Sequence, residues 1–421
     1  MLDLKLIRSD TERIKAALAR RGADGSIDEL LSLDARRRTL LPEIEAARGE
    51  RKSASEKIGE LKKSGQDAEA QIAAVHELKA KMETLETELA EVEAKRDEIA
   101  VSLPNIPDPT APDGFTDEDA VEIRKVGNPP EFNFEIRDHI ELSAPAGTID
   151  MEAGARTSGT RFTYLKGDLA MLEMSLVQWA LSLLREEGHE PVIPPVLVRE
   201  EALFGTGFLP GDREQIYELP KDDLFLVGTA EVPLASIHAD TIFEASELPV
   251  RYAGFSTCFR REAGAAGRDT RGIFRVHQFD KVEMFSFVEP SMAADEHERI
   301  LAIEEKILTE LELPYRVVNV AVGDLGSSAA KKYDCEAWIP SQGRYRELTS
   351  CSNTTDFQAR RLSSRFKSEP GAPTEFVNTL NGTAVAVGRT LIALLENHQL
   401  EDGKVAIPQA LQRHGAPETI G

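Results

Sequence analysis

The sequence predicts an α+β protein that begins with an antiparallel α-helical coiled-coil hairpin and continues into a larger domain of strands and helices. Three observations predict this fold class: heptads near the N-terminus, a Pro-rich segment after them, and short β-rich runs from residue 132 onward. We expect a helical arm over 1–103, a linker over 104–131 and the larger domain over 132–421.

The heptad pattern consists of two series of apolar positions at alternating spacings of three and four residues. The first series runs from Leu30 to Leu61 and the second from Val75 to Ile99, with Gly65 between them. Two helices of about 33 residues joined by a tight turn would form an antiparallel hairpin roughly 50 Å long. Long coiled coils most often serve as dimerisation elements or spacers, and for the hairpin alone that interpretation stays open.

The two predicted helices differ in charge. From Asp34 to Lys63 there are nine Lys and Arg residues against six Asp and Glu, a net charge of +3. From Asp67 to Ala100 there are four against ten, a net charge of −6. The whole chain carries −23, which disfavours indiscriminate binding to nucleic acid. The first helix could still follow a phosphate backbone, although Glu–Lys pairing on a helix surface explains part of the pattern without one.

Composition limits the class of protein. The chain has 421 residues, 41% of them hydrophobic and 29% charged, which is normal for a globular protein with a sizeable core. It has no apolar run of 18 residues, and its first residues lack the pattern of a secretory signal. The three cysteines include no CxxC pair. We therefore expect a cytoplasmic protein with no membrane span and no structural zinc site.

The larger domain begins with a predicted helix over 168–188, and short strands follow. Its glycines are spread singly, with neither a GxxxxGK[ST] nor a GxGxxG motif, which excludes the P-loop and Rossmann types of nucleotide site. A long hairpin is predicted for 255–283, with a glycine-containing loop over 263–272. Because side chains alternate along a strand, one face of it should carry Arg275, Phe279 and Glu283, and the other Phe274, Val276 and Val282.

Polar residues recur two positions apart elsewhere, where they should share a strand face. The pairs are Thr229 with Glu231, Glu347 with Thr349, and Asn381 with Thr383. A solvent-facing sheet surface laced with ion pairs would explain any one of these residues. It explains the whole set poorly.

Together these stretches resemble a known family. The chain is similar to the bacterial seryl-tRNA synthetases, which are class II aminoacyl-tRNA synthetases, from Met1 to nearly the C-terminus. The most specific matches are at 228–233, 259–262, 275–283, 350–361 and 381–389. The resemblance implies a tRNA-binding arm with a long coiled-coil hairpin over 1–103. It also implies a catalytic domain over 132–421, with a class II core of antiparallel sheet flanked by helices.

The resemblance also implies an activity. Such an enzyme activates L-serine with ATP and Mg²⁺ to seryl-adenylate, then transfers serine to the 3′ end of tRNA(Ser), and of tRNA(Sec) where the host has one. It implies a homodimer with Pro195 at the interface, and tRNA bound across both subunits.

For ATP, the resemblance implies that Arg260 holds the α-phosphate and the serine carboxylate, while Glu262 reads the adenine amino group. Phe279 would stack on the adenine, with Arg389 across the ring. The implied ATP residues are Arg260, Arg261, Glu262, Val276, Phe279, Glu347, Leu348, Thr349, Ser350 and Arg389. Of these, Arg260, Glu347 and Arg389 would be catalytic, and Glu347 and Ser350 would ligate Mg²⁺.

For L-serine, the resemblance places Thr229 and Glu231 toward the ammonium group, and Glu283 and Thr383 toward the hydroxyl group. The implied serine residues are Thr229, Ala230, Glu231, Arg260, Glu283, Asn381 and Thr383. The chain departs from the family pattern at Thr349 (usually Ser), Phe208 (commonly Gln) and Thr354 (frequently Cys). The Phe208 departure could alter how a loop closes over the substrate.

Two other functions are compatible with parts of the sequence. A paralogue that loads an amino acid onto a carrier protein typically lacks the full hairpin, which this chain keeps. A non-enzymatic RNA-binding scaffold on an inactive synthetase fold would have lost charged site residues. The chain retains Arg260, Glu262, Glu283, Glu347 and Arg389.

Overall fold

The computed structural model describes residues 1–264 and 271–421. They form two compact units, Leu2–Pro104 and Asn105–Gly421, with Met1 counted in the second. The central part of the loop predicted over 263–272 lies outside the described residues. In the two described ranges, no helix combines the length and the apolar character needed to cross a membrane.

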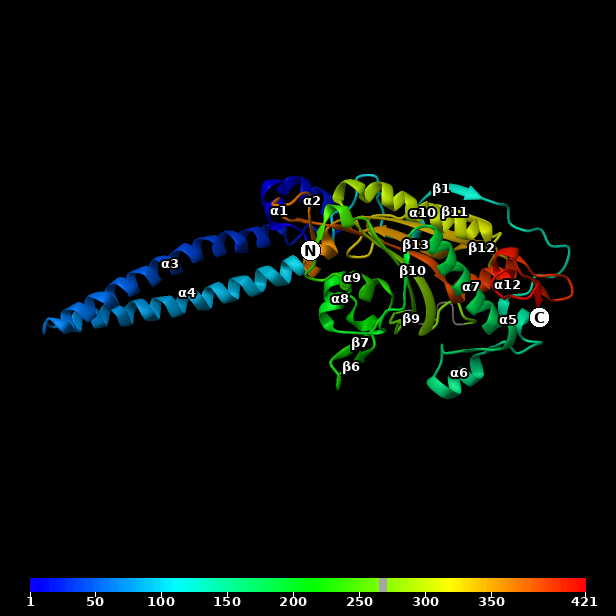
Figure 1. Cartoon of the computed structure of the whole chain (residues 1–421), viewed down its shortest axis with the longest axis horizontal. Coiled ribbons are helices and arrows are strands. Elements are labelled where there is room, and N and C mark those ends of the chain that lie inside the picture. The colour runs from blue at the N-terminus through cyan, green and yellow to red at the C-terminus, as the bar shows by residue number, and fades with distance from the viewer. Residues whose placement is uncertain (265–270) are drawn as a thin grey trace. The chain divides into compact units, whose positions relative to one another are not determined.

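The smaller unit is entirely helical. Its elements are α1 (Leu4–Ser9), α2 (Thr11–Ala19), α3 (Ile27–Lys63) and α4 (Glu69–Ser102). The two long helices α3 and α4 pack side by side as an antiparallel hairpin (Figure 1). Leu40 and Ile44 of α3 meet Leu85 and Val92 of α4 in a buried seam. The predicted coiled-coil hairpin is therefore confirmed.

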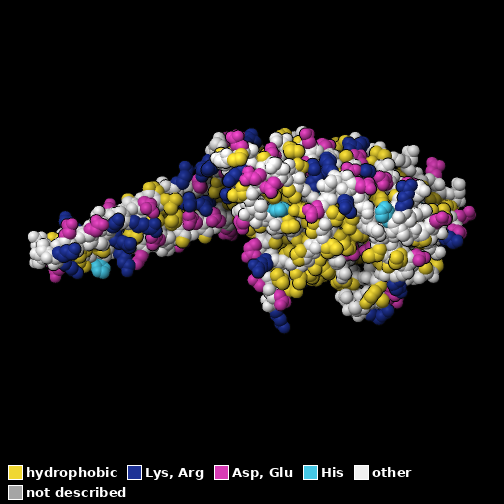
Figure 2. Space-filling view, in the orientation of Figure 1, with side chains coloured by type: hydrophobic (Ala, Val, Ile, Leu, Met, Phe, Trp, Pro, Cys, Tyr) yellow, Lys and Arg dark blue, Asp and Glu magenta, His cyan; other side chains and the backbone are white. Residues whose placement is uncertain are grey.

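Part of the basic charge of α3 pairs with α4. The pairs are Arg36 with Glu88, Arg37 with Glu93, and Arg48 with Glu86. Arg51, Lys52 and Lys57, nearer the tip, are exposed, and within the described ranges no ion pair joins them to a carboxylate. Figure 2 shows Lys and Arg side chains along the hairpin, among Asp and Glu side chains.

The larger unit is built on an eight-stranded sheet. In spatial order its strands are β1 (Val121–Val126), β11 (Tyr315–Asn319), β12 (Lys331–Ile339), β13 (Arg344–Asn353), β16 (Asn378–Ala386), β10 (Gln278–Val288), β9 (Val250–Phe259) and β4 (Glu190–Val192). All neighbours are antiparallel except β4 and β9. The antiparallel sheet is as predicted. Edge strand β1 lies in the segment that we expected to be a linker.

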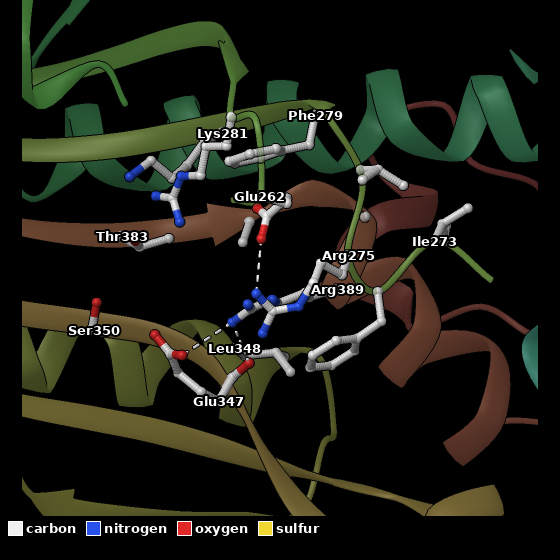
Figure 3. Close-up of a pocket in the computed structure, with 15 residues that line it drawn as sticks. Glu262, Ile273, Arg275, Phe279, Lys281, Glu347, Leu348, Ser350, Thr383 and Arg389 are labelled. Carbon is white, nitrogen blue, oxygen red and sulfur yellow. Dashed lines mark hydrogen bonds and ion pairs between the residues drawn. The ribbon is translucent and has the colours of Figure 1, made fainter. Parts of the chain in front are cut away.

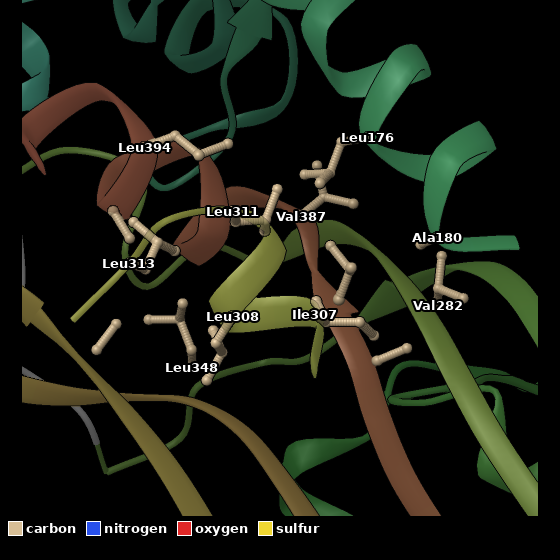
Figure 4. Packing of buried hydrophobic residues seen from close by; sticks show 14 of the residues in the cluster. Leu176, Ala180, Val282, Ile307, Leu308, Leu311, Leu313, Leu348, Val387 and Leu394 are labelled. Atoms are coloured by element: carbon tan, nitrogen blue, oxygen red, sulfur yellow. The ribbon is translucent and has the colours of Figure 1, made fainter. Parts of the chain in front are cut away.

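Three helices pack against one face of this sheet: α7 (Gly167–Glu186), α10 (Ala293–Glu310) and α12 (Val387–Asn397). Their apolar side chains meet in one core, where Leu176, Ile307 and Val387 lie close together (Figure 4). Val282 and Met284 of β10 belong to the same core, so the alternate residues Lys281 and Glu283 point to the opposite face of the sheet.

Shorter elements complete the larger unit. Its other helices are α5 (His139–Ser143), α6 (Met151–Ser158), α8 (Glu200–Thr206), α9 (Glu231–Ser236), α11 (Phe357–Leu362) and α13 (Gln409–Gln412). The other strands are β2 (Ile149–Asp150), β3 (Tyr164–Leu165), β5 (Leu197–Val198), β6 (Glu218–Leu219), β7 (Leu224–Leu226), β8 (Ile242–Glu244), β14 (Arg365–Lys367), β15 (Glu375–Phe376), β17 (Val405–Ala406) and β18 (Thr419–Ile420). Among them, α8, α9 and α11 pack together and border the site described below.

One predicted strand is wrong in part. The run from Ile273 to His277 was expected to continue β10, but β10 begins at Gln278. The backbone N–H of Ile273 donates to His139 Nε2, and that of His277 donates to the carbonyl oxygen of Arg161. Because these donors bind partners other than β9, the segment does not extend the ladder, and strand alternation does not apply to it.

Candidate active site

Two adjoining cavities open on the face of the sheet opposite α7, α10 and α12. Their volumes are about 130 Å³ and about 280 Å³, and we call them the first and the second cavity. Both are lined by Arg260, Lys281, Glu347, Ser350 and Thr383, which therefore stand at the junction between them. The strands β10, β13 and β16 supply all of these residues except Arg260, which directly follows β9.

The first cavity combines aromatic rings with guanidinium groups (Figure 3). The Arg260 guanidinium carbon lies 5.3 Å from the centroid of the Phe279 ring, and that of Arg389 lies 4.7 Å from the centroid of Phe274. Arg275 Nη1 donates to Glu262 Oε2 at 2.8 Å. A flat ring flanked by cations suits a planar, anionic ligand such as a nucleotide.

Phe274 and Val276 also line the first cavity, together with Arg275. They were expected on the opposite face from Arg275, and that expectation is wrong because the segment is not a strand. The same irregular backbone brings Ile273 to the cavity wall. Phe279, which does lie in β10, occupies the predicted face together with Glu283.

A β-bulge sets the direction of the β13 side chains. Cys335 of β12 pairs with Thr349 while the next residue, Glu336, pairs with Glu347, so Leu348 is the extra residue of β13. A bulge reverses the alternation, which brings Glu347 and Ser350 to the same cavities although they are three residues apart. The side-chain oxygens of two different residues thus face one space.

The same bulge turns the Thr349 side chain away from both cavities. Its side chain is 2% exposed, and its hydroxyl donates to Glu304 Oε2 of α10 on the far side of the sheet. The expectation that Glu347 and Thr349 share a face is therefore wrong. Leu348 does line the first cavity.

Glu347 is held as an anion. Arg389 Nη1 donates to the Glu347 carbonyl oxygen at 2.9 Å and to its carboxylate Oε2 at 3.2 Å. Burial alone would raise the pKa of Glu347, but Arg389, Lys332 and Arg260 outweigh it and lower that pKa to about 2. The carboxylate is thus ionised at neutral pH and available to a cation.

The second cavity is lined by hydroxyl, carboxylate and amide groups. Thr229 Oγ1 donates to Glu283 Oε2 at 3.0 Å, and the Glu231 backbone N–H donates to Thr229 Oγ1 at 3.2 Å. Lys281 forms an ion pair with Glu283. Asn381 and Thr383 of β16 complete the wall. The expected pairs Thr229 with Glu231 and Asn381 with Thr383 thus line one cavity. Glu231 is the first residue of α9 and Thr229 precedes that helix, so this pair does not lie in a strand.

Two groups in this cavity are unusual, one in its pKa and the other in its hydrogen bonding. Burial raises the pKa of Glu231 to about 7, the neighbouring Glu283 adds to the rise, and a hydrogen bond from Gln358 opposes it. Asn381 Oδ1 is buried and accepts no hydrogen bond from any residue in the two described ranges. A buried acceptor without a donor beside two acidic groups favours a ligand that brings N–H or O–H donors.

Besides Thr349, two further residues predicted for the site lie elsewhere. Arg261 Nε donates to the Ile216 carbonyl oxygen at 2.8 Å, and its guanidinium carbon lies 4.7 Å from the centroid of Tyr217. Arg261 and Ala230 line neither cavity through the described residues. Their neighbours Arg260 and Glu231 do so.

Several residues of the site were not singled out from the sequence. Lys281 stands between Phe279 and Glu283 at a spacing of two, so the strand periodicity could have identified it. Lys332 and Asp212 line the second cavity from distant elements, and no local sequence signal indicates them. Phe208, noted as a departure from the family pattern, also lines this cavity.

Comparisons with known proteins agree with this geometry. Residues 1–107 match the family model of the seryl-tRNA synthetase N-terminal domain, and residues 216–398 match that of the tRNA synthetase class II core domain (G, H, P, S and T). A serine–tRNA ligase of Thermobifida fusca is 50% identical over 416 residues, which cover 98% of this chain and 97% of that protein.

Solved structures agree as well. The seryl-tRNA synthetase of Pyrococcus horikoshii superposes with a TM-score of 0.93 at 41% identity, covering 100% of this chain and 99% of that chain. The cytoplasmic serine–tRNA ligase of Naegleria fowleri gives a TM-score of 0.87 at 33% identity, covering 100% and 98%. The fold, the paired cavities and these full-length similarities lead to one conclusion: the chain belongs to the seryl-tRNA synthetase family of class II aminoacyl-tRNA synthetases.

Proposed function

We propose that this chain activates L-serine with ATP to seryl-adenylate and transfers the serine to the 3′ end of tRNA(Ser), and of tRNA(Sec) in a host that has one. The observation that carries the proposal is the pair of adjoining cavities, one aromatic and cationic and the other acidic and rich in hydroxyl groups. In support, the Pyrococcus horikoshii relative was solved with ATP and the Naegleria fowleri relative with AMP.

The first cavity would bind ATP. Phe279 offers a ring for the adenine to stack on, and Glu262 offers a carboxylate to its amino group. Arg389 would cover the other side of the base and approach the γ-phosphate, while Val276 would contribute its backbone. Arg275 already binds Glu262 and so holds that carboxylate in place.

The second cavity would bind serine. Glu231 and Thr229 supply acceptors for the ammonium group, and Glu283 and Thr383 supply partners for the hydroxyl group. Asn381 Oδ1, buried and without a hydrogen bond from the described residues, is a further acceptor for a serine donor. The serine carboxylate would then point to the junction of the cavities, where Arg260 lies.

Adenylate formation needs the carboxylate oxygen to attack the α-phosphorus as pyrophosphate leaves. The two reactants are both anions, so positive charge at the junction lowers the barrier, and Arg260 and Lys281 provide it. No side-chain nucleophile is required, and positioning supplies much of the acceleration. In the second step a ribose hydroxyl of the tRNA 3′ end attacks the adenylate carbonyl, and AMP leaves.

The residues at the junction also fit Mg²⁺. Glu347 is ionised, and the bulge at Leu348 directs Ser350 into the same space, which gives two oxygen ligands. Mg²⁺ commonly takes one or two protein ligands together with substrate phosphates. When bound, it would offset charge on the phosphates. Through the described residues there is no cluster of three His, Cys, Asp or Glu side chains that could hold a metal alone.

The helical arm would bind tRNA. Arg51, Lys52 and Lys57 are exposed and hold no ion pair to the described carboxylates, so they are available to phosphates. We propose that 1–103 form the arm, that 104–131 form a connecting segment which also contributes β1 to the sheet, and that 132–421 form the catalytic domain.

We further propose a cytoplasmic homodimer with tRNA bound across both subunits. The region of α7 and the residues after β4, including Pro195, would form the subunit interface. Met171, Met174 and Ile193 are 56%, 53% and 83% exposed there. Figure 2 shows hydrophobic side chains gathered on the larger unit. An exposed apolar area of this kind is typical of a subunit interface.

The direct test is amino-acid-dependent ATP–pyrophosphate exchange with each of the twenty amino acids, followed by charging of total tRNA. Serine should support exchange far better than any other amino acid, and serine should be esterified to tRNA. Exchange without charging would favour transfer to another acceptor, such as a carrier protein. Absence of exchange in a folded, ATP-binding protein would contradict the proposed function.

A further inference from the structure

Glu231 is held by a residue that lines neither cavity. Gln358 of α11 is 0% exposed, and its Nε2 donates to Glu231 Oε1 at 2.7 Å. The two residues are 127 positions apart in the sequence. A charge-assisted hydrogen bond between two buried groups fixes the carboxylate in one orientation more firmly than a solvent-exposed contact would.

The orientation of the Gln358 amide is itself fixed. Thr379 Oγ1 donates to Gln358 Oε1 at 2.8 Å, and the nitrogen faces Glu231 and the Thr206 carbonyl oxygen. Because a carbonyl oxygen only accepts hydrogen bonds, Thr206 fixes which end of the amide carries the nitrogen. Thr379 in turn is held by Thr354, whose hydroxyl donates to the Thr379 carbonyl oxygen at 2.7 Å. The second hydrogen of Nε2 donates to the Thr206 carbonyl oxygen at 3.2 Å, at the end of α8.

We propose that Gln358 is a positioning residue for substrate binding: it orients Glu231 and keeps it ready to receive the ammonium group of the amino acid. This inference rests on the proposed function, since it takes an amino acid as the ligand of the second cavity. Gln358 does not touch the substrate, and it acts through Glu231 alone. Thr354, where the family often has Cys, belongs to the chain of hydroxyl groups that orients the amide.

Charge explains why Glu231 needs this partner. Glu283 and Lys281 face it from β10, and Arg260 faces it from the segment after β9. Burial is the largest cause of its raised pKa, Glu283 adds to the rise, and the Gln358 hydrogen bond lowers it. Loss of the bond would therefore raise the pKa of Glu231 further. A smaller fraction of the enzyme would then carry the anionic carboxylate that an ammonium group requires at neutral pH.

The test replaces Gln358 by Met, which has a similar size and no N–H donor. Gln399→Met is the matched control, because Gln399 is 4% exposed and its Nε2 donates to the Arg137 and Glu396 carbonyl oxygens, with no contact to the second cavity. Circular dichroism and thermal melting would verify that both variants fold. Serine-dependent ATP–pyrophosphate exchange would then give KM for serine, KM for ATP and kcat, at pH values from 5.5 to about 9.

Gln358→Met should raise KM for serine at least about tenfold, the usual scale for losing a hydrogen bond to a buried charged group. KM for ATP should change less than about twofold, since the ATP residues are untouched. The acidic limb of kcat/KM for serine should move to higher pH. Gln399→Met should change neither KM for serine nor the acidic limb, even if it lowers the melting temperature as much as Gln358→Met does.

Thr379→Val provides a second route if Gln358→Met does not fold. It keeps the amide and removes the hydroxyl that orients it, so it should also raise KM for serine, by a smaller factor than Gln358→Met. An unchanged KM for serine and an unmoved acidic limb, in whichever variant folds, would overturn the inference. Absence of exchange in the wild-type protein would instead contradict the proposed function.

Discussion

Thr229 donates a hydrogen bond through its hydroxyl to Glu283 across the second cavity, at 3.0 Å, although the two residues are 54 positions apart. Thr229 precedes α9 while Glu283 lies in β10, so the bond joins a helix start to the central sheet. The same hydroxyl accepts the Glu231 backbone N–H. One threonine thus links the two acidic groups to which we assign the serine substrate.

Replacing Thr229 by Val should weaken serine binding. The variant keeps the shape of the side chain and removes both hydrogen bonds, which leaves Glu283 with Lys281 as its remaining partner. A lost hydrogen bond to a buried charge costs about 1.5–3 kcal/mol, so kcat/KM for serine should fall by roughly 10- to 100-fold. KM for ATP should stay the same. An equal rise in both KM values would mean that the variant disturbs the whole site.

Replacing Glu231 by Gln should make the protein more stable at alkaline pH and less active. The pKa of Glu231 is raised from 4.5 to about 7 in the folded protein, so the folded state binds a proton that the unfolded state releases. The free energy of unfolding of the wild type should therefore fall as pH rises from about 4.5 to about 7, by on the order of 3 kcal/mol. The free energy of unfolding of Glu231→Gln should not fall over this pH range.

Thermal melting of both proteins at pH 5 and pH 8.5 would measure this difference. The melting temperature of Glu231→Gln should exceed that of the wild type at pH 8.5 by more than at pH 5, while serine-dependent exchange is lost. The same difference in melting temperature between the two proteins at pH 5 and at pH 8.5 would show that the Glu231 carboxyl is not protonated in the folded protein.

Deleting residues 1–103 should separate the two steps of the reaction. Every residue that lines the two cavities lies after position 205, so serine-dependent pyrophosphate exchange should be largely retained. Charging of tRNA should collapse, because the arm would no longer hold the tRNA. Loss of both activities in a truncated protein that still folds and dimerises would count against this division of labour.

Reversing Arg51, Lys52 and Lys57 to Glu should weaken tRNA binding and flatten its dependence on salt. Each lost phosphate contact reduces the slope of log K against log salt by about 0.9 on a duplex. Reversing Lys79 and Lys81 of α4, in the helix of net negative charge, is the matched control. Equal effects of the two sets, measured by filter binding from about 50 to 200 mM salt, would contradict a specific role for α3.

The hairpin and the antiparallel sheet could be predicted because their signals are local. The heptads specify which residues of α3 and α4 meet, and Leu40, Ile44, Leu85 and Val92 do form the buried seam. The alternation along β10 likewise placed Phe279 and Glu283 on one face. The strand order of the sheet could not be predicted, because it depends on contacts between segments far apart in the chain.

The errors in the site have local physical causes. Strand alternation predicts that Thr349 shares a face with Glu347, but a bulge at Leu348 reverses the alternation, and the buried Glu304 gives the Thr349 hydroxyl a partner on the other side. Strand alternation predicts Phe274 on the face opposite Arg275, but the segment from Ile273 to His277 is not a strand. No local pattern links Gln358 to Glu231, since the two residues are 127 positions apart in the sequence.

The measurement that tests the central claim most directly is kcat/KM for serine, alanine and threonine in the wild type and in Thr383→Ala. A site that hydrogen-bonds a substrate hydroxyl rejects the analogue lacking it by roughly 10⁴- to 10⁵-fold, so the wild type should prefer serine to alanine by about that factor. Threonine keeps the hydroxyl and should be excluded by its methyl group. Thr383→Ala should lose far more activity with serine than with alanine, so its preference for serine over alanine in kcat/KM should be smaller than that of the wild type. Equal losses for serine and alanine would show that Thr383 does not read the hydroxyl, and would contradict the placement of serine in the second cavity.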